Sequence, residues 1–173
     1  KEQTLQEYFN EHENVSDNNR AKWNEIEFQQ SSTRLINKIN EAFLILMDEH
    51  EDILFIGEDI LSPYGGAFKA TKNLSAKHPD RVFTTPISEG AITGIANGLS
   101  IKGYRPFLEI MFGDFISLAF DQIINHASKF YHMYNKRVNC PIIIRTPMGG
   151  KRGFGPTHSQ TLDKFLIGMD NVK

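Results

Sequence analysis

The sequence has one cysteine, no long apolar run and no strong charge of either sign. Cys140 stands alone among 173 residues, which excludes an internal disulfide bond and a cysteine-rich zinc site and favours a reducing compartment. No apolar run approaches the ~18 residues of a membrane helix, and no signal peptide is present. We therefore expect a soluble, cytoplasmic protein without a membrane partner. Nineteen Lys and Arg against 21 Asp and Glu give a net charge of −2, which argues against a nucleic-acid partner held by bulk charge.

The length is that of one domain, but residues 1–31 differ from the rest. This stretch is rich in Glu, Gln and Asn and contains no Gly or Pro. Leu5, Tyr8 and Phe9 have the i, i+3, i+4 spacing of a short amphipathic helix. We interpret residues 1–31 as a linker or docking arm and residues 32–173 as the domain. Because the chain opens on Lys1 without a methionine, we expect it to be a piece of a longer protein that lacks the C-terminal part of its parent.

Apolar periodicity from Ser32 onward predicts helices that alternate with short strands. Helices are expected after a cap at Ser32 or Thr33, then at about 68–77, 88–103, 114–134 and from 159. Strands are expected at 53–57, 81–85, 106–111 and 141–145. The alternation predicts an α/β fold with a doubly wound, mainly parallel sheet flanked by helices on both faces. Loops 57–66, 84–90, 111–115 and 146–158 should then line one rim, where such sheets bind ligands.

The glycine-rich loop from Gly149 to Gly155 fits neither common nucleotide motif. A phosphate-binding loop needs Ser or Thr after Gly-Lys, and Arg152 stands there instead. A dinucleotide fingerprint needs a third glycine where His158 is found. The six histidines show no metal-binding spacing, so we expect no metal site in this chain. The loop is then either a flexible rim loop or a substrate-facing one.

Two single residues have both a structural and a functional interpretation. Ser88 and Glu89 can simply cap a helix, where the dipole favours an ionised carboxylate by ~0.3–1 kcal/mol. Burial at the rim can raise a carboxyl pKa by up to ~3–5 units, which would outweigh the dipole and make Glu89 a proton donor. His158 follows the glycine-rich loop, and the sequence contains no G-x-S-x-G motif that would supply the serine of a catalytic triad. The interpretation of His158 as a loop residue without a catalytic role therefore stays open.

Glycines recur every four residues after Glu89, at Gly90, Gly94 and Gly98. Each costs the helix roughly 1 kcal/mol relative to alanine, so their face should allow the close approach of another helix. Spacing leaves open whether that helix belongs to the same chain or to another subunit.

Several segments together match a known pattern in the right order. They are Gly57-Glu58-Asp59, Tyr64-Gly65-Gly66-Ala67-Phe68-Lys69-Ala70-Thr71-Lys72, Thr85-Pro86-Ile87-Ser88-Glu89, Gly103-Tyr104-Arg105-Pro106, Asp121-Gln122-Ile123-Ile124-Asn125 and His158-Ser159-Gln160. From about Leu35 to its end, the chain resembles the beta subunit of the 2-oxoacid dehydrogenases, the thiamine-diphosphate-dependent decarboxylating component of pyruvate and branched-chain oxoacid complexes. The resemblance implies the pyrimidine-binding module of the transketolase-like superfamily.

The resemblance also implies roles for five residues. Glu89 would be catalytic and would contact a ring nitrogen of the cofactor's aminopyrimidine, where proton sharing favours the imino tautomer. Phe115 would stack on the pyrimidine and Met111 would line the same pocket. Glu58 would lie near Glu89 on a proton path between paired sites, and His158 would stand at the mouth of the substrate channel.

Partners follow from the same resemblance. Thiamine diphosphate would be held jointly with a diphosphate-binding module that carries the magnesium, as a separate alpha subunit or fused upstream. A lipoyl-bearing acyltransferase would take the acyl group, and the helix of Gly90, Gly94 and Gly98 would form a contact between subunits of a homo-oligomer. The chain would be inactive alone.

Two alternatives stay open beside oxidative decarboxylation. The segment Gly155-Pro156-Thr157-His158 resembles a sequence motif of transketolase and deoxyxylulose-phosphate synthase. This resemblance would imply ketol transfer between sugar phosphates. A module of the same fold could also serve assembly without catalysis, although assembly alone requires neither Glu89, Phe115 nor His158.

Overall fold

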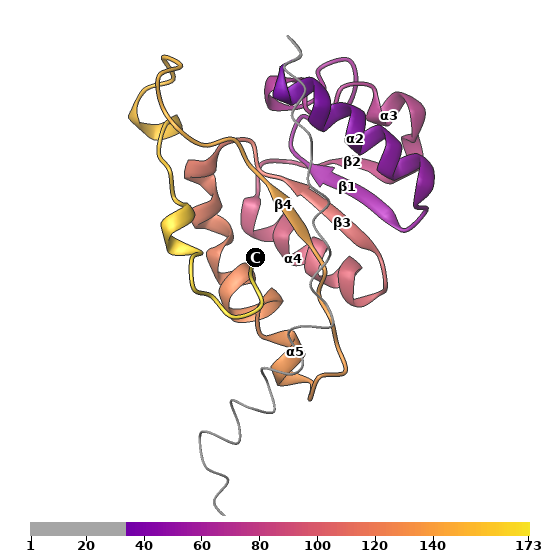
Figure 1. The fold of residues 1–173 in the computed structure, drawn as a ribbon, viewed down its shortest axis with the longest axis vertical. Helices are drawn as coiled ribbons and strands as arrows, with labels where there is room; N and C mark the ends of the chain where they lie inside the picture. The colour runs from indigo at the N-terminus through magenta and orange to yellow at the C-terminus, as the bar shows by residue number, and fades with distance from the viewer. Residues whose placement is uncertain (1–33) are drawn as a thin grey trace, which may run out of the picture. The chain divides into compact units, whose positions relative to one another are not determined.

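A computed structural model of the chain describes residues 34–173. Its centre is a four-stranded sheet with the strand order β2-β1-β3-β4, and every pairing is parallel (Figure 1). The strands are β1 (Ile53–Gly57), β2 (Val82–Thr84), β3 (Arg105–Glu109) and β4 (Ile143–Arg145). The four expected strands are therefore present, somewhat shorter than predicted at β2, β3 and β4. The arm expected over residues 1–31 lies outside the described residues.

One face of the sheet packs against helices α2 (Leu35–Glu49) and α3 (Leu74–Lys77). Its centre is aromatic: the rings of Phe55 and Phe107 stack with centroids 4.8 Å apart. Phe43 of α2 meets both rings edge-on, at 4.9 and 5.4 Å. Such edge contacts add to the apolar burial that drives the packing.

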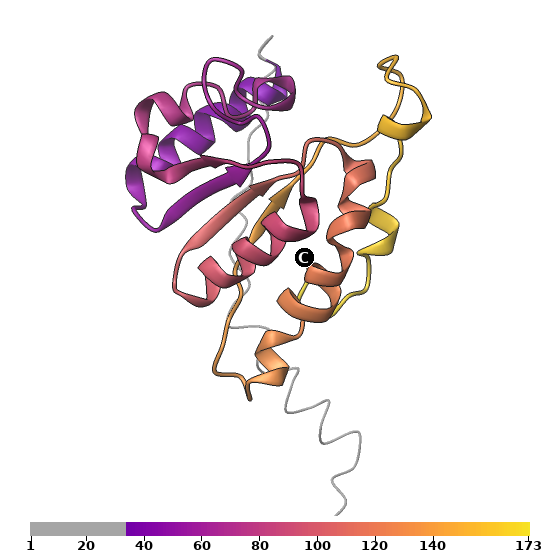
Figure 2. The same cartoon turned by 180° about the vertical axis from the view of Figure 1, so that it is seen from behind.

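The opposite face is covered by α4 (Glu89–Ile101) and by the helical segment that follows β3 (Figure 2). Because side chains alternate along a strand, Ile56 and Leu108 point to this face while their neighbours Phe55 and Phe107 point to the other. Ile92 and Ala96 of α4 fill the space above them. Helices on both faces of a parallel sheet confirm the predicted doubly wound α/β class.

The helix expected at 68–77 is replaced by a 3-10 turn (Ala67–Lys69), further turns and the short α3. Phe68 and Lys69 have left-handed backbone conformations, which interrupt a right-handed helix. The side-chain amide of Asn40 on α2 donates to the carbonyls of Ala70 and Lys72, at 2.8 and 2.9 Å. These carbonyls therefore bond to a neighbouring element instead of to a helix of their own.

The long helix expected at 114–134 is divided into a 3-10 helix (Gly113–Ala119), a π-helix (Gln122–Ala127) and α5 (Phe130–Met133). The amide of Ser128 donates to the carbonyl of Ile123 at 3.0 Å, the wider spacing of a π-turn. The side chain of Asn97 on α4 donates to the carbonyl of Gln122 at 2.9 Å, so packing on α4 accompanies the break. The helix expected from residue 159 is only a single 3-10 turn, Asp163–Phe165.

The glycines of α4 face a helix of the same chain. A Cβ at Gly90 would lie 3.1 Å from the carbonyl oxygen of Leu118, and one at Gly94 would lie 3.2 Å from Oε1 of Gln122. A Cβ at Gly98 would meet nothing within 4 Å. At Gly90 and Gly94 the close approach is made by the segment after β3 of the same chain. The assignment of this helix to a contact between subunits stays a prediction.

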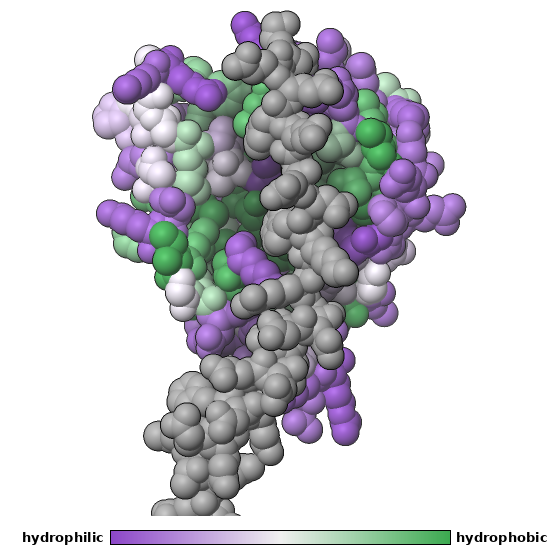
Figure 3. Space-filling model, viewed as in Figure 1, coloured by the Kyte–Doolittle hydropathy of each residue, from purple (hydrophilic) through white to green (hydrophobic). Residues whose placement is uncertain are grey.

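Apolar side chains also reach the surface in patches between hydrophilic ones, on the face seen in Figure 3. Within residues 34–173, no helix combines the length and apolar character needed to cross a membrane.

Candidate functional site

The carboxyl ends of the parallel strands meet along one rim of the sheet and carry the residues singled out in the sequence. Glu58 directly follows β1, and Glu89 opens α4 after β2. Met111 follows β3, and the loop that leads to His158 follows β4. Parallel pairing brings these ends to the same side, as the topology of the sheet requires.

Glu58 and Glu89 form a buried pair of carboxyl groups at this rim. Each residue is only 5% exposed. The backbone N–H of Ser88 donates to Oε1 of Glu58 at 2.9 Å, which links the end of β1 to the start of α4. Burial raises the pKa of Glu58, the Ser88 N–H partly opposes this, and the neighbouring charges of Glu89 and Asp59 raise it further. Glu58 therefore holds a proton more readily than an exposed carboxyl group does.

Ser88 begins α4 without the side-chain cap that the sequence suggested. Its carbonyl accepts the first helical bond from Ile92 at 3.0 Å, while its hydroxyl donates to the carbonyl of Pro86 at 3.2 Å. No side-chain cap bond is formed at the start of α4. Within residues 34–173, Glu58 has a hydrogen-bond donor but no donor lies on the carboxyl group of Glu89. The Glu89 carboxyl group thus keeps its hydrogen-bonding capacity for another molecule.

The rings of Phe112, Phe115 and His158 form an aromatic wall at the rim. Phe115 lies on the helical segment whose Leu118 carbonyl contacts Gly90, so this segment stands against the start of α4. The imidazole of His158 meets Phe115 edge-on at 5.2 Å and Phe112 at 4.8 Å. The structure therefore brings Phe115 and His158 together, although they are far apart in sequence.

The remaining contacts of His158 are local. The hydroxyl of Thr157 lies 2.9 Å from its Nδ1, and the ring is partly buried. Met111 is half-buried in the turn between β3 and Gly113, and its predicted place in a cofactor pocket stays a prediction.

Two polar pairs at the rim were not singled out from the sequence. Glu109, at the end of β3, forms a buried ion pair with Arg145, its register partner on β4. Asp114 accepts hydrogen bonds from Gln160, 46 residues further along the chain. Gln160 lies in the segment His158-Ser159-Gln160 that carried the resemblance, but the partner of a side chain at such a distance has no local sequence signal.

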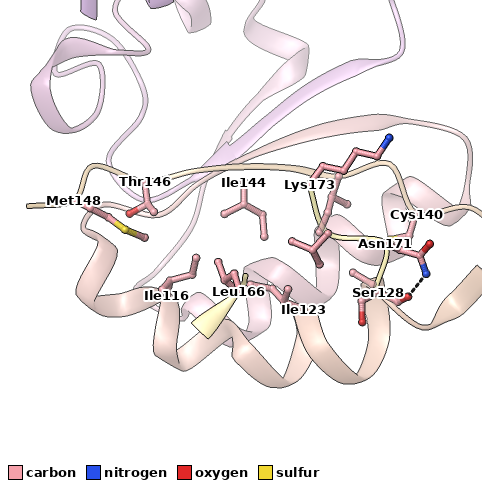
Figure 4. A pocket seen from close by; sticks show the side chains of 13 residues that line it. Ile116, Ile123, Ser128, Cys140, Ile144, Thr146, Met148, Leu166, Asn171 and Lys173 are labelled. Atoms are coloured by element: carbon pink, nitrogen blue, oxygen red, sulfur yellow. Dashed lines mark hydrogen bonds between the residues drawn. The ribbon is translucent and has the colours of Figure 1, made fainter. Parts of the chain in front are cut away.

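A cavity of about 350 Å³ lies beneath β4, away from the two carboxyl groups (Figure 4). Its lining is largely apolar, and the side chain of Asn171 closes one end by donating to the carbonyl of Ser128 at 2.8 Å. The residues around it include Ile116, Ile123, Ile144, Met148 and Leu166. Neither Glu58 nor Glu89 lines this cavity, so it is not the rim site. In residues 34–173, no group of three or more His, Cys, Asp or Glu side chains is placed to hold a metal ion.

Comparison with known protein families identifies the family of this chain. The family model "Transketolase, pyrimidine binding domain" matches residues 31–173. The chain belongs to this pyrimidine-binding family. The match covers the part of the chain that carried the resemblance seen in the sequence.

Relatives of this pyrimidine-binding domain include beta subunits of several oxidoreductases. The chain is 37% identical to the acetoin:2,6-dichlorophenolindophenol oxidoreductase subunit beta of Cupriavidus necator, over 78% of this chain and 43% of the relative. It is 38% identical to a pyruvate dehydrogenase E1 component subunit beta of Staurastrum punctulatum, over 83% of this chain and 44% of the relative. It is 36% identical to a 2-oxoisovalerate dehydrogenase subunit beta of Bacillus subtilis, over 80% of this chain and 42% of the relative. The chain thus spans less than half the length of these curated relatives.

A solved structure supports the fold alone. The chain superimposes on "Split gene transketolase, inactive beta4 tetramer" with a TM-score of 0.54 and 24% identity, over 73% of this chain and 36% of the other.

The residues of this pyrimidine-binding domain fit the ring for which the family is described. The buried carboxyl group of Glu89 is without a donor in the described chain, and an aromatic ring stands on the helical segment beside it. A carboxyl group in such a place can share a proton with a ring nitrogen, and an aromatic side chain can stack on the ring.

Proposed function

We propose that the chain is the pyrimidine-binding half of a thiamine-diphosphate enzyme that oxidatively decarboxylates a 2-oxoacid and passes the acyl group to a lipoyl carrier. The observation that carries the proposal is the buried pair of Glu58 and Glu89 at the rim of a pyrimidine-binding domain. Relatives named as beta subunits of pyruvate and 2-oxoisovalerate dehydrogenases support the substrate class.

When bound, thiamine diphosphate would supply the carbon nucleophile and the electron sink that decarboxylation needs. Glu89 would hold a proton at a ring nitrogen of the aminopyrimidine, since its carboxyl group is buried at the start of α4. Glu58 would exchange protons with Glu89, because its own pKa is raised by burial and by the charge of Glu89.

The aromatic wall would orient both the ring and the substrate. Phe115 would stack on the pyrimidine, and Met111 would line the pocket beside it. His158, which contacts Phe115 at 5.2 Å, would face the substrate and supply a polar group at the entrance.

The other half of the site would come from a diphosphate-binding module that carries the magnesium, as an alpha subunit or a fused segment. A lipoyl-bearing acyltransferase would accept the acyl group, and the assembly would be an oligomer in the cytoplasm.

The test is the substitution Glu89→Gln in the complete protein with its diphosphate-binding module. Removing a positioned proton-transfer group should lower kcat by about 10²–10⁴-fold, with an unchanged circular dichroism spectrum. The exposed Glu51→Gln is the matched control and should leave turnover unchanged. Near-normal turnover of the Glu89 variant would refute the assignment of this carboxyl group.

Two observations favour other substrates for the same site. The name of one relative gives acetoin as its substrate. The segment Gly155-Pro156-Thr157-His158 resembles a sequence motif of ketol-transferring enzymes. Release of carbon dioxide from several 2-oxoacids, oxidation of acetoin and ketol transfer between sugar phosphates should therefore be assayed side by side. Activity with 2-oxoacids alone supports the proposal. No turnover in any of the three, with the partner module bound, would instead indicate an assembly role.

A further inference from the structure

We propose that Asp114 and Gln160 form a latch that fixes the loop carrying His158 against the rim, so that Asp114 is a positioning residue for this histidine. The proposal depends on the proposed function only for what His158 then does to the substrate. Asp114 lies at the start of the helical segment Gly113–Ala119, and its side chain is buried with the residue 8% exposed.

The carboxylate of Asp114 accepts bonds from both donors of one residue. The side-chain amide of Gln160 donates to Oδ1 at 2.9 Å. The backbone N–H of Gln160 lies 3.4 Å from each carboxylate oxygen. Among residues 34–173, every hydrogen bond to the side chain of Asp114 comes from Gln160. Asp114 therefore bonds to the distant loop and not to its own helix.

The neighbouring residue anchors the other end of the same loop. The amide of Gly113 donates to the carbonyl of Pro147 at 2.8 Å. A Cβ at Gly113 would lie 2.3 Å from Cγ of Met148, so only glycine allows Met148 to pack so closely. Inside the loop, the amide of Gly149 donates to the carbonyl of Gln160 at 3.2 Å and closes its neck.

His158 lies within this closed loop, two residues before Gln160. The rings of Phe112 and Phe115 meet the imidazole edge-on and supply no hydrogen bond. Its polar neighbour Thr157 belongs to the loop itself. Aromatic edge contacts are weak and short-ranged. The position of the imidazole therefore depends on the position of the loop that carries it. The polar tie between the rim and the part of the loop beside His158 is the set of bonds from Gln160 to the carboxyl group of Asp114.

Reversing the two partners tests the latch. Gln160→Glu keeps the size of the side chain but places a carboxylate against that of Asp114, so the bond is replaced by repulsion. Asp114→Asn alone keeps one acceptor oxygen and should have a smaller effect. The double variant Asp114→Asn with Gln160→Glu restores a charge-assisted bond in the opposite direction. Asp163→Asn removes a charge from an exposed residue three positions beyond Gln160 and is the matched control.

The first readout is the imidazole proton signals of His158 in the full chain, measured by NMR with labelled histidine and assigned with His158→Gln. In the parent chain these signals should be shifted by the rings of Phe112 and Phe115. They should move toward the position of an unstructured histidine in Gln160→Glu and return in the double variant, while the signals of the other described histidines stay in place as evidence of folding. Unmoved signals in Gln160→Glu, or no return in the double variant, would overturn the latch.

The second readout is kinetic and separates the latch from the proposed function. With the diphosphate-binding module present, Gln160→Glu should raise KM for the 2-oxoacid by about tenfold, the equivalent of one lost interaction, with a much smaller change in kcat. The double variant should recover KM. If the NMR signals respond as expected and KM does not, the latch stands and the role of His158 toward the substrate is wrong.

Discussion

Glu109 offers the sharpest test of the energetics of the rim. It ends β3, is 3% exposed and forms an ion pair with Arg145 on the adjacent strand. Burial raises the pKa of its carboxyl group from 4.5 to about 7, although the charge and hydrogen bond of Arg145 act in the opposite direction. The perturbation is Glu109→Gln, which keeps the shape of the side chain and removes its titration.

The sign of the pH dependence follows from the raised pKa. Between pH 4.5 and about 7, the folded state binds a proton at Glu109 that the unfolded state has lost. The free energy of unfolding must then fall as the pH rises through this window. Each pKa unit corresponds to about 1.4 kcal/mol, so the two pKa values imply a loss of at most about 3 kcal/mol between pH 4.5 and 8.

The assay is urea unfolding followed by far-UV circular dichroism at pH 5, 6, 7 and 8. The parent chain should lose more stability across this range than Glu109→Gln, and the difference between the two isolates Glu109 from other titrating groups such as Glu58. Glu51→Gln, at an exposed position, should follow the parent curve. A parent chain that gains stability relative to Glu109→Gln as the pH rises would show that attraction to Arg145 outweighs burial and would refute the reasoning.

Two further substitutions test the packing of the sheet by chemical denaturation. Phe107→Ala should cost about 3–5 kcal/mol, because it empties the centre of the aromatic cluster, whereas the exposed Phe165→Ala should cost little. Gly57→Ala should cost about 1–3 kcal/mol, since its Cβ would lie 2.7 Å from the carbonyl oxygen of Glu109. Gly98→Ala, with nothing within 4 Å, should instead stabilise α4 by up to about 1 kcal/mol. Equal effects of the two glycine substitutions would contradict the contacts described for Gly57.

The strands could be predicted from sequence because their signal is local. Ile53–Gly57 is a short apolar run, and all five of its residues are buried. The helix predictions that were wrong concern segments whose conformation depends on contacts with residues far away in sequence. The sequence near Ala70 does not indicate that the side chain of Asn40, thirty residues earlier, donates a hydrogen bond to the Ala70 carbonyl. This bond accompanies the break in the predicted helix. In the same way, the π-turn before Ser128 accompanies a bond from Asn97 on α4 to the carbonyl of Gln122.

The features of the site also differ in whether local sequence predicts them. Glu58 and Glu89 could be placed at one rim because parallel strands share an end. The side-chain cap expected at Ser88 is absent, since the hydroxyl bonds to Pro86. Asp114 was not found, because its importance lies in a partner 46 residues away and not in any spacing of its own.

The link between Glu58 and α4 has a consequence for how freely this region can vary. The donor to Glu58 is the backbone N–H of residue 88, and the side chain of Ser88 takes no part in it. Every amino acid except proline supplies this N–H. Nineteen of the twenty residue types can therefore supply this donor, so the link between Glu58 and α4 does not depend on the serine side chain at position 88. Variation in this turn can accumulate while the acid pair keeps its geometry.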